Sequence, residues 1–253
     1  MTVLADPVGE TRRIIEAADA SGVTIRAVGG VGVALVAPTV TLLRPRRTYH
    51  DIDLVAPAGA ARIIRLVTDL GYTPAKTFNA LNGSERLLFH DADGRRIDVF
   101  LDTLRMCHEL RLGERLAVAA WPLTLAPADL LLSKLQIVEL TDRDGQDVLA
   151  LLADHELSDG DGTGIDLRRM REVCDRDWGW WRTVDDNLAR LVARWIEPLR
   201  PPESAPVGAR SGATDRAREL RDALASSPKT LAWKVRAAIG PRVRWYDVPE
   251  EVR

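Results

Sequence analysis

Apolar positions in the first hundred residues follow two alternating patterns. Apolar residues at helical spacing predict helices, and short runs rich in β-branched residues predict strands. The predicted order is helix 11–20, strand 23–28, helix 31–37, strand 51–55, helix 58–70 and a hairpin of strands 85–90 and 96–101. The turn of that hairpin is Asp91-Ala92-Asp93-Gly94. This order predicts a small mixed sheet with helices packed against it.

From about residue 124 the helical spacing continues without strand-like alternation. Helices are predicted over residues 128–140, 144–155, 166–175, 183–197 and 215–239, with a linker at 198–212 that is rich in Pro, Ser, Gly and Ala. The predicted fold class is therefore α/β (α+β), with an all-helical C-terminal half. We expect an α/β domain at 1–115, a helical domain at 116–200, and a linker with a basic helical region at 201–253.

Composition places the chain among globular proteins. Of its 253 residues 46% are apolar and 28% are charged, and the net charge of −2 does not favour general nucleic-acid binding. Cys107 and Cys174 lie far apart without a CxxC spacing, which argues against a disulfide framework or a zinc site. There is no signal-peptide core, and no stretch approaches eighteen uncharged apolar residues. A cytoplasmic protein without a membrane segment is expected.

Asp51-Ile52-Asp53 places two acids on a predicted strand. Side chains at i and i+2 of a strand point to the same face, so both carboxylates project together while Ile52 turns into the core. Two neighbouring carboxylates repel each other unless a cation lies between them, and Mg²⁺ prefers such oxygen ligands. A solvated strand end is the simpler interpretation of this motif by itself.

A third acid, Asp98, interrupts the apolar strand 96–101. Val99 and Leu101 share one face, so Asp98 faces the other way together with Arg96 and Phe100. If this strand lies beside strand 51–55, three carboxylates converge. Such a cluster is typical of two-metal phosphoryl transfer, in which the ions contact the attacking and leaving oxygens. Asp98 is then the expected base for the acceptor hydroxyl.

Gly29 and Gly30 stand between a predicted strand and a predicted helix. Glycines there allow close approach to a phosphate at the helix N-terminus, although two glycines after a strand more often form only a tight turn. Followed by Asp51-Ile52-Asp53 and Ile97-Asp98-Val99-Phe100, they resemble the signature of the polymerase-β-type nucleotidyltransferase superfamily over residues 23–102. The resemblance implies that Asp51, Asp53 and Asp98 hold two Mg²⁺ ions, with Mn²⁺ as a substitute, and that a nucleoside triphosphate is the substrate.

The helical half carries a finer resemblance. Asp129-Leu130-Leu131-Leu132-Ser133-Lys134-Leu135 and Arg143-Asp144-Gly145-Gln146-Asp147-Val148 are similar to the AbiEii-type abortive-infection nucleotidyltransferases, the toxins of type IV toxin–antitoxin pairs. This implies that Lys134 contacts triphosphate oxygens, that Asp144 or Asp147 orders the pocket, and that a cognate antitoxin exists. The alternative for Lys134 is an exposed polar position on a leucine-rich helix.

Two arginine-rich segments suggest phosphate contacts. Arg44, Arg46 and Arg47 precede the acids, and Arg47 is the best candidate for a triphosphate contact because guanidinium matches phosphate geometry. Between residues 209 and 246 nine basic and three acidic residues give a net charge of +6. This is a candidate contact region for RNA backbone, and a tRNA 3′ end is the leading acceptor. A basic helix packed on the protein is the alternative.

Two further functions remain open. The form His50-Asp51-Ile52-Asp53 also resembles nucleotidyltransferases that modify aminoglycoside or lincosamide antibiotics. An acidic groove with Asp159, Asp161 and Asp166 would suit aminoglycosides, which are polycations. A catalytically inert nucleotidyltransferase-fold binding module is the third possibility. Trp178, Trp180 and Trp181 could stack a base, but aromatics so close together more often anchor a helix end.

Overall fold

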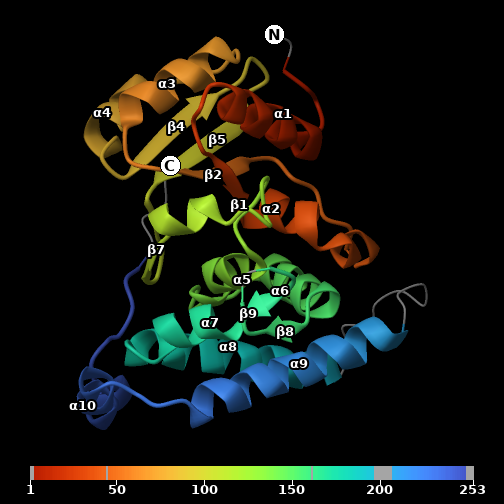
Figure 1. Ribbon diagram of the computed structural model, residues 1–253, viewed down its shortest axis with the longest axis vertical. Helices are drawn as coiled ribbons and strands as arrows, with labels where there is room; N and C mark the ends of the chain where they lie inside the picture. Colours follow the sequence, from red (N-terminus) through yellow and green to blue (C-terminus); the bar gives the residue numbers. More distant parts are fainter. Residues whose placement is uncertain (1–2, 44, 161, 197–206, 249–253) are drawn as a thin grey trace. The chain divides into compact units, whose positions relative to one another are not determined.

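The computed structural model describes residues 3–43, 45–160, 162–196 and 207–248 (Figure 1). The chain divides into two compact units, and each unit is built from separate segments. The first comprises Met1–Val36, Thr48–Leu104 and Leu110–Leu125, and the second Ala37–Arg47, Arg105–Glu109 and Ala126–Arg253. Among the described helices, none is both long and apolar enough to cross a membrane.

The first unit is built around a five-stranded mixed sheet (Figure 1). Its strands are β1 (Arg26–Val28), β2 (Ile52–Ala56), β3 (Thr73–Pro74), β4 (Arg86–His90) and β5 (Arg96–Leu101). They lie in the order β1-β2-β5-β4-β3, in which β2 and β5 are parallel and the other neighbours are antiparallel. The mixed sheet and the β4–β5 hairpin confirm the predicted fold class.

Four helices belong to this unit: α1 (Pro7–Ala20), α2 (Gly29–Val36), α3 (Ala60–Asp69) and α4 (Lys76–Asn82). Alternate strand residues make one face of the sheet almost wholly apolar, and α1 and α3 supply the side chains that cover it. This core includes Ile14, Ile15, Ile63, Val67, Ile52, Leu54, Leu87, Phe89, Ile97 and Val99. Residues of opposite parity, among them Asp53 and Asp98, therefore lie on the other face.

The second unit is mostly helical, as predicted. It contains α5 (Pro127–Leu135), α6 (Asp142–Asp154), α7 (Leu167–Cys174), α8 (Trp178–Ile196), α9 (Val207–Ser226) and α10 (Leu231–Ile239). Helix α9 packs against α6 and α8, and α5 contacts α6, α7 and α8. Two short strands, β8 (Leu157–Ser158) and β9 (Ile165–Asp166), pair in parallel.

Several predicted boundaries in this unit are wrong. Helix α5 ends at Leu135 and not at residue 140, and α8 begins at Trp178 and not at 183. Helix α9 begins at Val207, inside the predicted linker 198–212; residues 197–206 lie outside the described part of the chain. The predicted helix 215–239 is two helices, because α9 ends at Ser226 and α10 begins at Leu231. Thr230 is the N-cap of α10, and its side chain accepts the N–H of Trp233.

The remaining elements are short. Strands β6 (Thr103–Arg105) and β7 (Glu109–Arg111) form a two-stranded sheet, and three 3₁₀ turns are present: η1 (Pro38–Leu42), η2 (Gly113–Ala117) and η3 (Gly240–Arg242). Sequence reasoning did not predict any of these elements, nor α4, β3, β8 or β9. Each is too short to develop a recognisable hydrophobic period.

Candidate active site

Two of the three predicted acids are direct neighbours across the sheet. The parallel pairing of β2 and β5 sets Asp53 opposite Asp98, so both side chains leave the same face. Asp98 is only 1% exposed, whereas Asp53 is half-buried. The sheet face with these two carboxylates is the one that α1 and α3 leave uncovered.

Asp51 precedes the strand. Strand β2 begins at Ile52, so Asp51 is an exposed residue at its entrance and not a strand residue, which corrects the prediction of strand 51–55. Ile52 is fully buried, as the alternation predicts. Asp51 nevertheless remains close to the other two acids, since it contributes with them to the electrostatic environment of Arg96.

Gly29 is required by the position of Asp53. It has a left-handed φ of +66°, and a Cβ atom at residue 29 would lie 2.2 Å from Oδ2 of Asp53. Gly29 and Gly30 are the first two residues of α2, so the Asp53 carboxylate lies beside the positive end of that helix. The structure thus gives Gly29 a role in accommodating the carboxylate. The predicted contact of Gly29 and Gly30 with phosphate stays a prediction.

Asp98 is held by two arginines from the neighbouring hairpin. Arg86 donates to Oδ1 from Nε at 2.8 Å and from Nη2 at 2.7 Å. Arg96 donates to Oδ2 from Nη2 at 2.9 Å and from Nε at 3.2 Å. The Arg86 guanidinium also lies over the Phe100 ring, 4.9 Å from its centroid. Both carboxylate oxygens of Asp98 therefore already accept charge-assisted hydrogen bonds.

Sequence reasoning missed both arginines as partners of Asp98. Arg96 was assigned to the correct face, and its spacing of i, i+2 to Asp98 on one strand could have revealed the contact. Arg86 could be found only from the hairpin register, in which Leu88 faces Asp98 and Arg86 faces Phe100. Residue 86 is then a diagonal neighbour of residue 98 on the same face.

The electrostatics link all three acids to one guanidinium. Burial lowers the pKa of Arg96, but Asp98 and, to a smaller extent, Asp51 and Asp53 raise it, and the net shift is upward. Three carboxylates against Arg86 and Arg96 leave one net negative charge on this face. We call this group of five residues the carboxylate face: Asp51, Asp53, Asp98, Arg86 and Arg96.

Carboxylate oxygens are suitable ligands for Mg²⁺ or Mn²⁺, and Asp53 and Asp98 are register partners on neighbouring strands. In the described part of the chain, however, no three His, Cys, Asp or Glu side chains lie together in an arrangement that could hold a metal. Asp98 instead faces Arg86 and Arg96. A cation at Asp98 would have to displace at least one guanidinium.

The candidates from the helical half form a separate cluster within the second unit. Lys134 Nζ lies 3.1 Å from Oδ1 of Asp144 and 2.9 Å from Oδ2 of Asp147, and Arg47 Nη2 lies 2.9 Å from the same Asp147 oxygen. We call these four residues the lysine cluster. The alternative of an exposed Lys134 is wrong, because its side chain is only 13% accessible.

Two cations and two carboxylates neutralise each other in the lysine cluster. Burial alone would lower the pKa of Lys134, but Asp147 and Asp144 raise it by more than burial lowers it. The net shift of the pKa is upward, so the ammonium stays charged. The pKa of Asp147 is raised because burial outweighs the contributions of Lys134 and Arg47. Its Oδ1 atom is buried and accepts no hydrogen bond from any residue that the structure describes. That oxygen is an unsatisfied polar atom beside two cationic groups.

Asp144 has an additional structural role. Its carboxylate accepts from the backbone N–H and hydroxyl of Thr141, while the Thr141 hydroxyl accepts from the Asp144 N–H. This reciprocal pair is a capping box at the start of α6. The residue predicted to order a nucleotide pocket therefore also determines where the helix begins.

The basic C-terminal region is largely engaged in contacts within the protein. Arg216 donates to the carbonyls of Leu152 and Ala153, and Arg221 pairs with Asp185 at 2.7 Å. Similar contacts bind Arg218 to Asp215, Lys229 to Asp175 and Arg236 to two backbone carbonyls. Lys234, Arg242 and Arg244 remain exposed, and the side chain of Arg210 lies outside the described residues. Most of the predicted RNA footprint thus serves packing.

The remaining sequence candidates have local roles. Trp180 stacks on His108, Trp178 contacts Trp245 edge-on and Trp181 contacts Trp233 edge-on, which supports the prediction that they anchor a helix end. His50 is exposed near Thr48, and Arg44 lies outside the described residues. In the proposed acidic groove, Asp166 is buried and caps α7, Asp159 is exposed, and Asp161 is not described.

No protein-family model and no curated protein sequence matches the chain. Among solved structures, the chain is similar to the solution structure of the antibiotic-resistance factor ANT(2'')-Ia, which shows substrate-regulated conformation dynamics. The two sequences are 15% identical, the match covers 75% of this chain and 92% of that chain, and the TM-score is 0.35.

Proposed function

We propose that this protein is a divalent-metal-dependent nucleotidyltransferase that moves a nucleoside monophosphate from a nucleoside triphosphate to an acceptor hydroxyl. The observation that carries the proposal is the pairing of Asp53 with Asp98 on neighbouring parallel strands, beside a glycine whose missing Cβ makes room for Asp53. Acids on a sheet face that also carries arginines suit a reaction of metal-bound phosphates.

In this reaction the acceptor oxygen forms a bond to the α-phosphorus, the bond from that phosphorus to the β-phosphate oxygen breaks, and pyrophosphate leaves. Asp51 and Asp53 would hold the cation, with Asp98 completing the set. Bound Mg²⁺ would supply charge stabilisation for the phosphate oxygens. Asp98 would accept the hydroxyl proton, and this role requires it to leave Arg86 or Arg96.

For the lysine cluster we propose contact with the triphosphate. Lys134 and Arg47 are cationic groups that match phosphate oxygens, and Asp144 and Asp147 hold them in place. The unsatisfied oxygen of Asp147 shows that the cluster's hydrogen bonding is incomplete. The roles of Gly29 and Gly30 near phosphate belong to the same proposal.

The acceptor we favour is a small molecule rather than RNA. Of the eight C-terminal cations whose side chains are described, five have partners within the chain, although Arg218 among them is exposed. This leaves fewer unengaged charges for a phosphate backbone. A polycationic antibiotic is the small-molecule class suggested by the sequence. The toxin role and a cognate antitoxin belong to the alternative in which RNA is the acceptor, and both depend on that alternative being correct.

A label-transfer experiment tests the proposal. The protein is incubated with each α-labelled nucleoside triphosphate, Mg²⁺, and either total tRNA or a mixture of aminoglycosides and lincosamides. We expect label on a small molecule, and a loss of roughly three orders of magnitude in Asp53→Asn. Asp69→Asn, an exposed acid on α3, is the matched control and should retain activity.

The outcomes separate the alternatives. Label on tRNA and on no small molecule would reverse the choice of acceptor and support the toxin role. Transfer that survives Asp53→Asn would contradict the catalytic assignment. Absence of both transfer and nucleotide binding would favour an inert binding module.

A further inference from the structure

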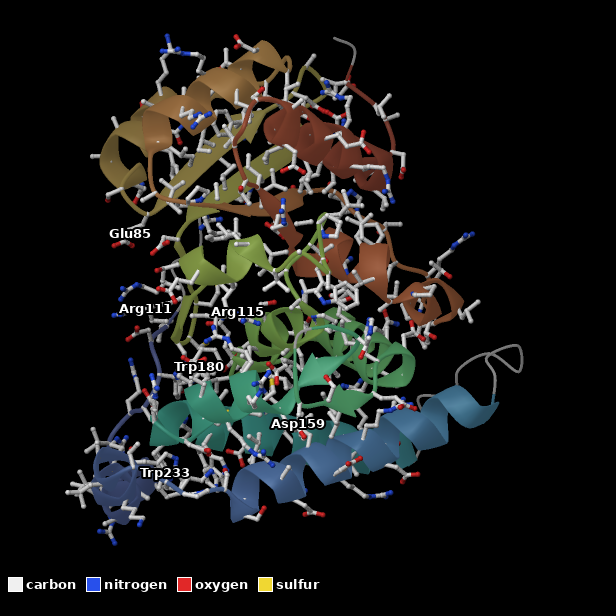
Figure 2. All side chains as sticks on the ribbon, viewed as in Figure 1. Glu85, Arg111, Arg115, Asp159, Trp180 and Trp233 are labelled. Atoms are coloured by element: carbon white, nitrogen blue, oxygen red, sulfur yellow. The ribbon has the colours of Figure 1, made fainter. Side chains whose placement is uncertain are left out.

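The second unit contains a cavity of about 460 Å³ that the proposed transfer reaction does not use. Three chain segments form it: residues 107–109, the start of α8, and residues 244–247. Trp180, one of its lining residues, is labelled in Figure 2. Hydrogen bonds tie these segments together, since Trp180 Nε1 donates to the Glu109 carbonyl and the Asp247 N–H donates to the Cys107 carbonyl.

Trp180, Trp245 and Tyr246 contribute aromatic rings to a cavity wall that also contains charged residues. Trp245 and Tyr246 contact each other with centroids 5.4 Å apart and an interplanar angle of 77°, so the pair presents two ring surfaces at nearly a right angle. Trp180 is buried and stacks on His108 at 4.9 Å. Arg244 also lines the cavity and lies 6.0 Å from the Tyr246 centroid, so this ring already contacts a cation of the chain.

Three acidic residues line the same cavity. Glu109 pairs with Arg105 at 2.6 Å, which leaves the carboxylates of Asp177 and Asp247. Both approach the His108 ring, because both raise the pKa of that histidine against the larger effect of burial, which lowers it to about 4. The imidazole is therefore neutral at pH 7 and does not balance their charge. Within the described residues neither carboxylate has an ion pair, and only Oδ1 of Asp177 is used, as a cap for Gly179 and Trp180.

We propose that this cavity is a binding site for a small organic cation, an ammonium ion carried on a hydrophobic group. The ammonium would lie between the carboxylates of Asp177 and Asp247, and the hydrophobic part would contact the rings of Trp245 and Tyr246. Both contacts favour positive charge: carboxylates accept ammonium hydrogen bonds, and the faces of aromatic rings attract cations. The site is independent of nucleotidyl transfer.

Tryptophan in the cavity wall provides the readout. Phenethylammonium is titrated against the protein at pH 7.5 while indole fluorescence and the Trp245 and Trp180 N–H signals in NMR spectra are followed. The neutral control ligand is 2-phenylethanol, which has nearly the same shape and carries a hydroxyl in place of the ammonium. We expect phenethylammonium to bind roughly tenfold more tightly than the alcohol. High salt should weaken the binding of phenethylammonium and leave the binding of the alcohol unchanged.

Variants locate the site. Asp247→Asn and Asp177→Asn should each weaken phenethylammonium binding by roughly tenfold, and asparagine preserves the cap at the start of α8. Glu219→Gln removes one exposed charge from the same unit outside the cavity and should leave binding unchanged. Thermal melting of each variant verifies folding.

The proposal is overturned if the alcohol binds as tightly as the ammonium, if neither aspartate variant weakens binding, or if Glu219→Gln weakens it as much as they do. Absence of any perturbation by phenethylammonium at millimolar concentration would also overturn it.

Discussion

The absence of a side chain at residue 29 makes room for the carboxylate of Asp53. Gly29 has the same left-handed backbone as Gly94 in the β4–β5 turn, at φ +66° and +83°, but only Gly29 has a neighbour where a Cβ would be. Alanine at either position costs about 1–2 kcal/mol in backbone strain. Alanine at position 29 must in addition move the Asp53 carboxylate.

We therefore expect Gly29→Ala to lose more stability than Gly94→Ala in urea unfolding, and to lose transfer activity where Gly94→Ala keeps it. Equal losses of stability, with activity intact in both variants, would show that Asp53 does not depend on the missing Cβ.

The arginines of the carboxylate face should compete with metal. Arg86 and Arg96 occupy both oxygens of Asp98, so removing either charge should raise the affinity for a divalent cation. We expect Arg96→Gln to bind Mn²⁺ roughly tenfold more tightly than the unmodified protein, measured by electron paramagnetic resonance. Arg65→Gln, an exposed arginine on α3, is the control for net charge. Weaker Mn²⁺ binding in Arg96→Gln would contradict the competition.

His108 should make stability depend on pH. Burial lowers its pKa from the usual 6.5 to about 4, so the unfolded chain binds a proton that the folded protein rejects. Its contribution is complete above pH 6.5 and is lost as the pH falls through 4. Relative to His108→Gln, which lacks this titration, the protein should lose about 3 kcal/mol between pH 7.5 and pH 4. Urea unfolding at each pH measures the unfolding free energy of the unmodified protein and of His108→Gln. If the two free energies change with pH in parallel, the lowered pKa of His108 is contradicted.

At the residue scale, alternation was the informative signal. Strand parity alone correctly placed Ile52 in the core, and it correctly placed Asp98 on the face of the sheet away from Val99. What parity cannot give is the partner of a charged side chain on a neighbouring strand. Arg86 contacts Asp98 because the hairpin register makes them diagonal neighbours, and that register is a property of the folded pair.

At the level of elements, the capping box of α6 connects stability with a candidate site. Thr141 accepts from the N–H of Asp144 and donates to its carboxylate, and the same carboxylate contacts Lys134. Thr141→Ala should cost about 1 kcal/mol in unfolding free energy, because one helix N–H loses its partner. Thr141→Ser preserves the hydroxyl and should cost less. If both variants cost the same, the cap does not stabilise the helix.

Predictions of elements failed where tertiary packing outweighs composition. The segment before residue 212 contains proline, serine and glycine and was assigned to a linker, yet α9 begins at Val207. Its buried residues Ala213, Ala217, Leu220 and Leu224 follow helical spacing and face α6 and α8. Burial of that stripe stabilises a helix whose N-terminal sequence has weak intrinsic propensity.

At the scale of the whole molecule, the candidate residues belong to two compact units. The acids Asp51, Asp53 and Asp98 lie in the first unit, whereas Arg47 lies with the lysine cluster in the second. Sequence order hides this division, because residues 37–47 join the helical unit through contacts across more than a hundred positions, such as Thr39 with Asp154. Hydrophobic periodicity carries no information on such long-range pairing.

The most direct test of the central claim is a Mn²⁺ titration in the presence of a nucleoside triphosphate analogue whose α–β bond cannot be cleaved. We expect Mn²⁺ to bind to the unmodified protein and to Asp69→Asn, and its affinity to fall by at least roughly tenfold in Asp53→Asn and in Asp51→Asn. Equal Mn²⁺ affinity in all four proteins would contradict the claim that the carboxylate face holds the metal.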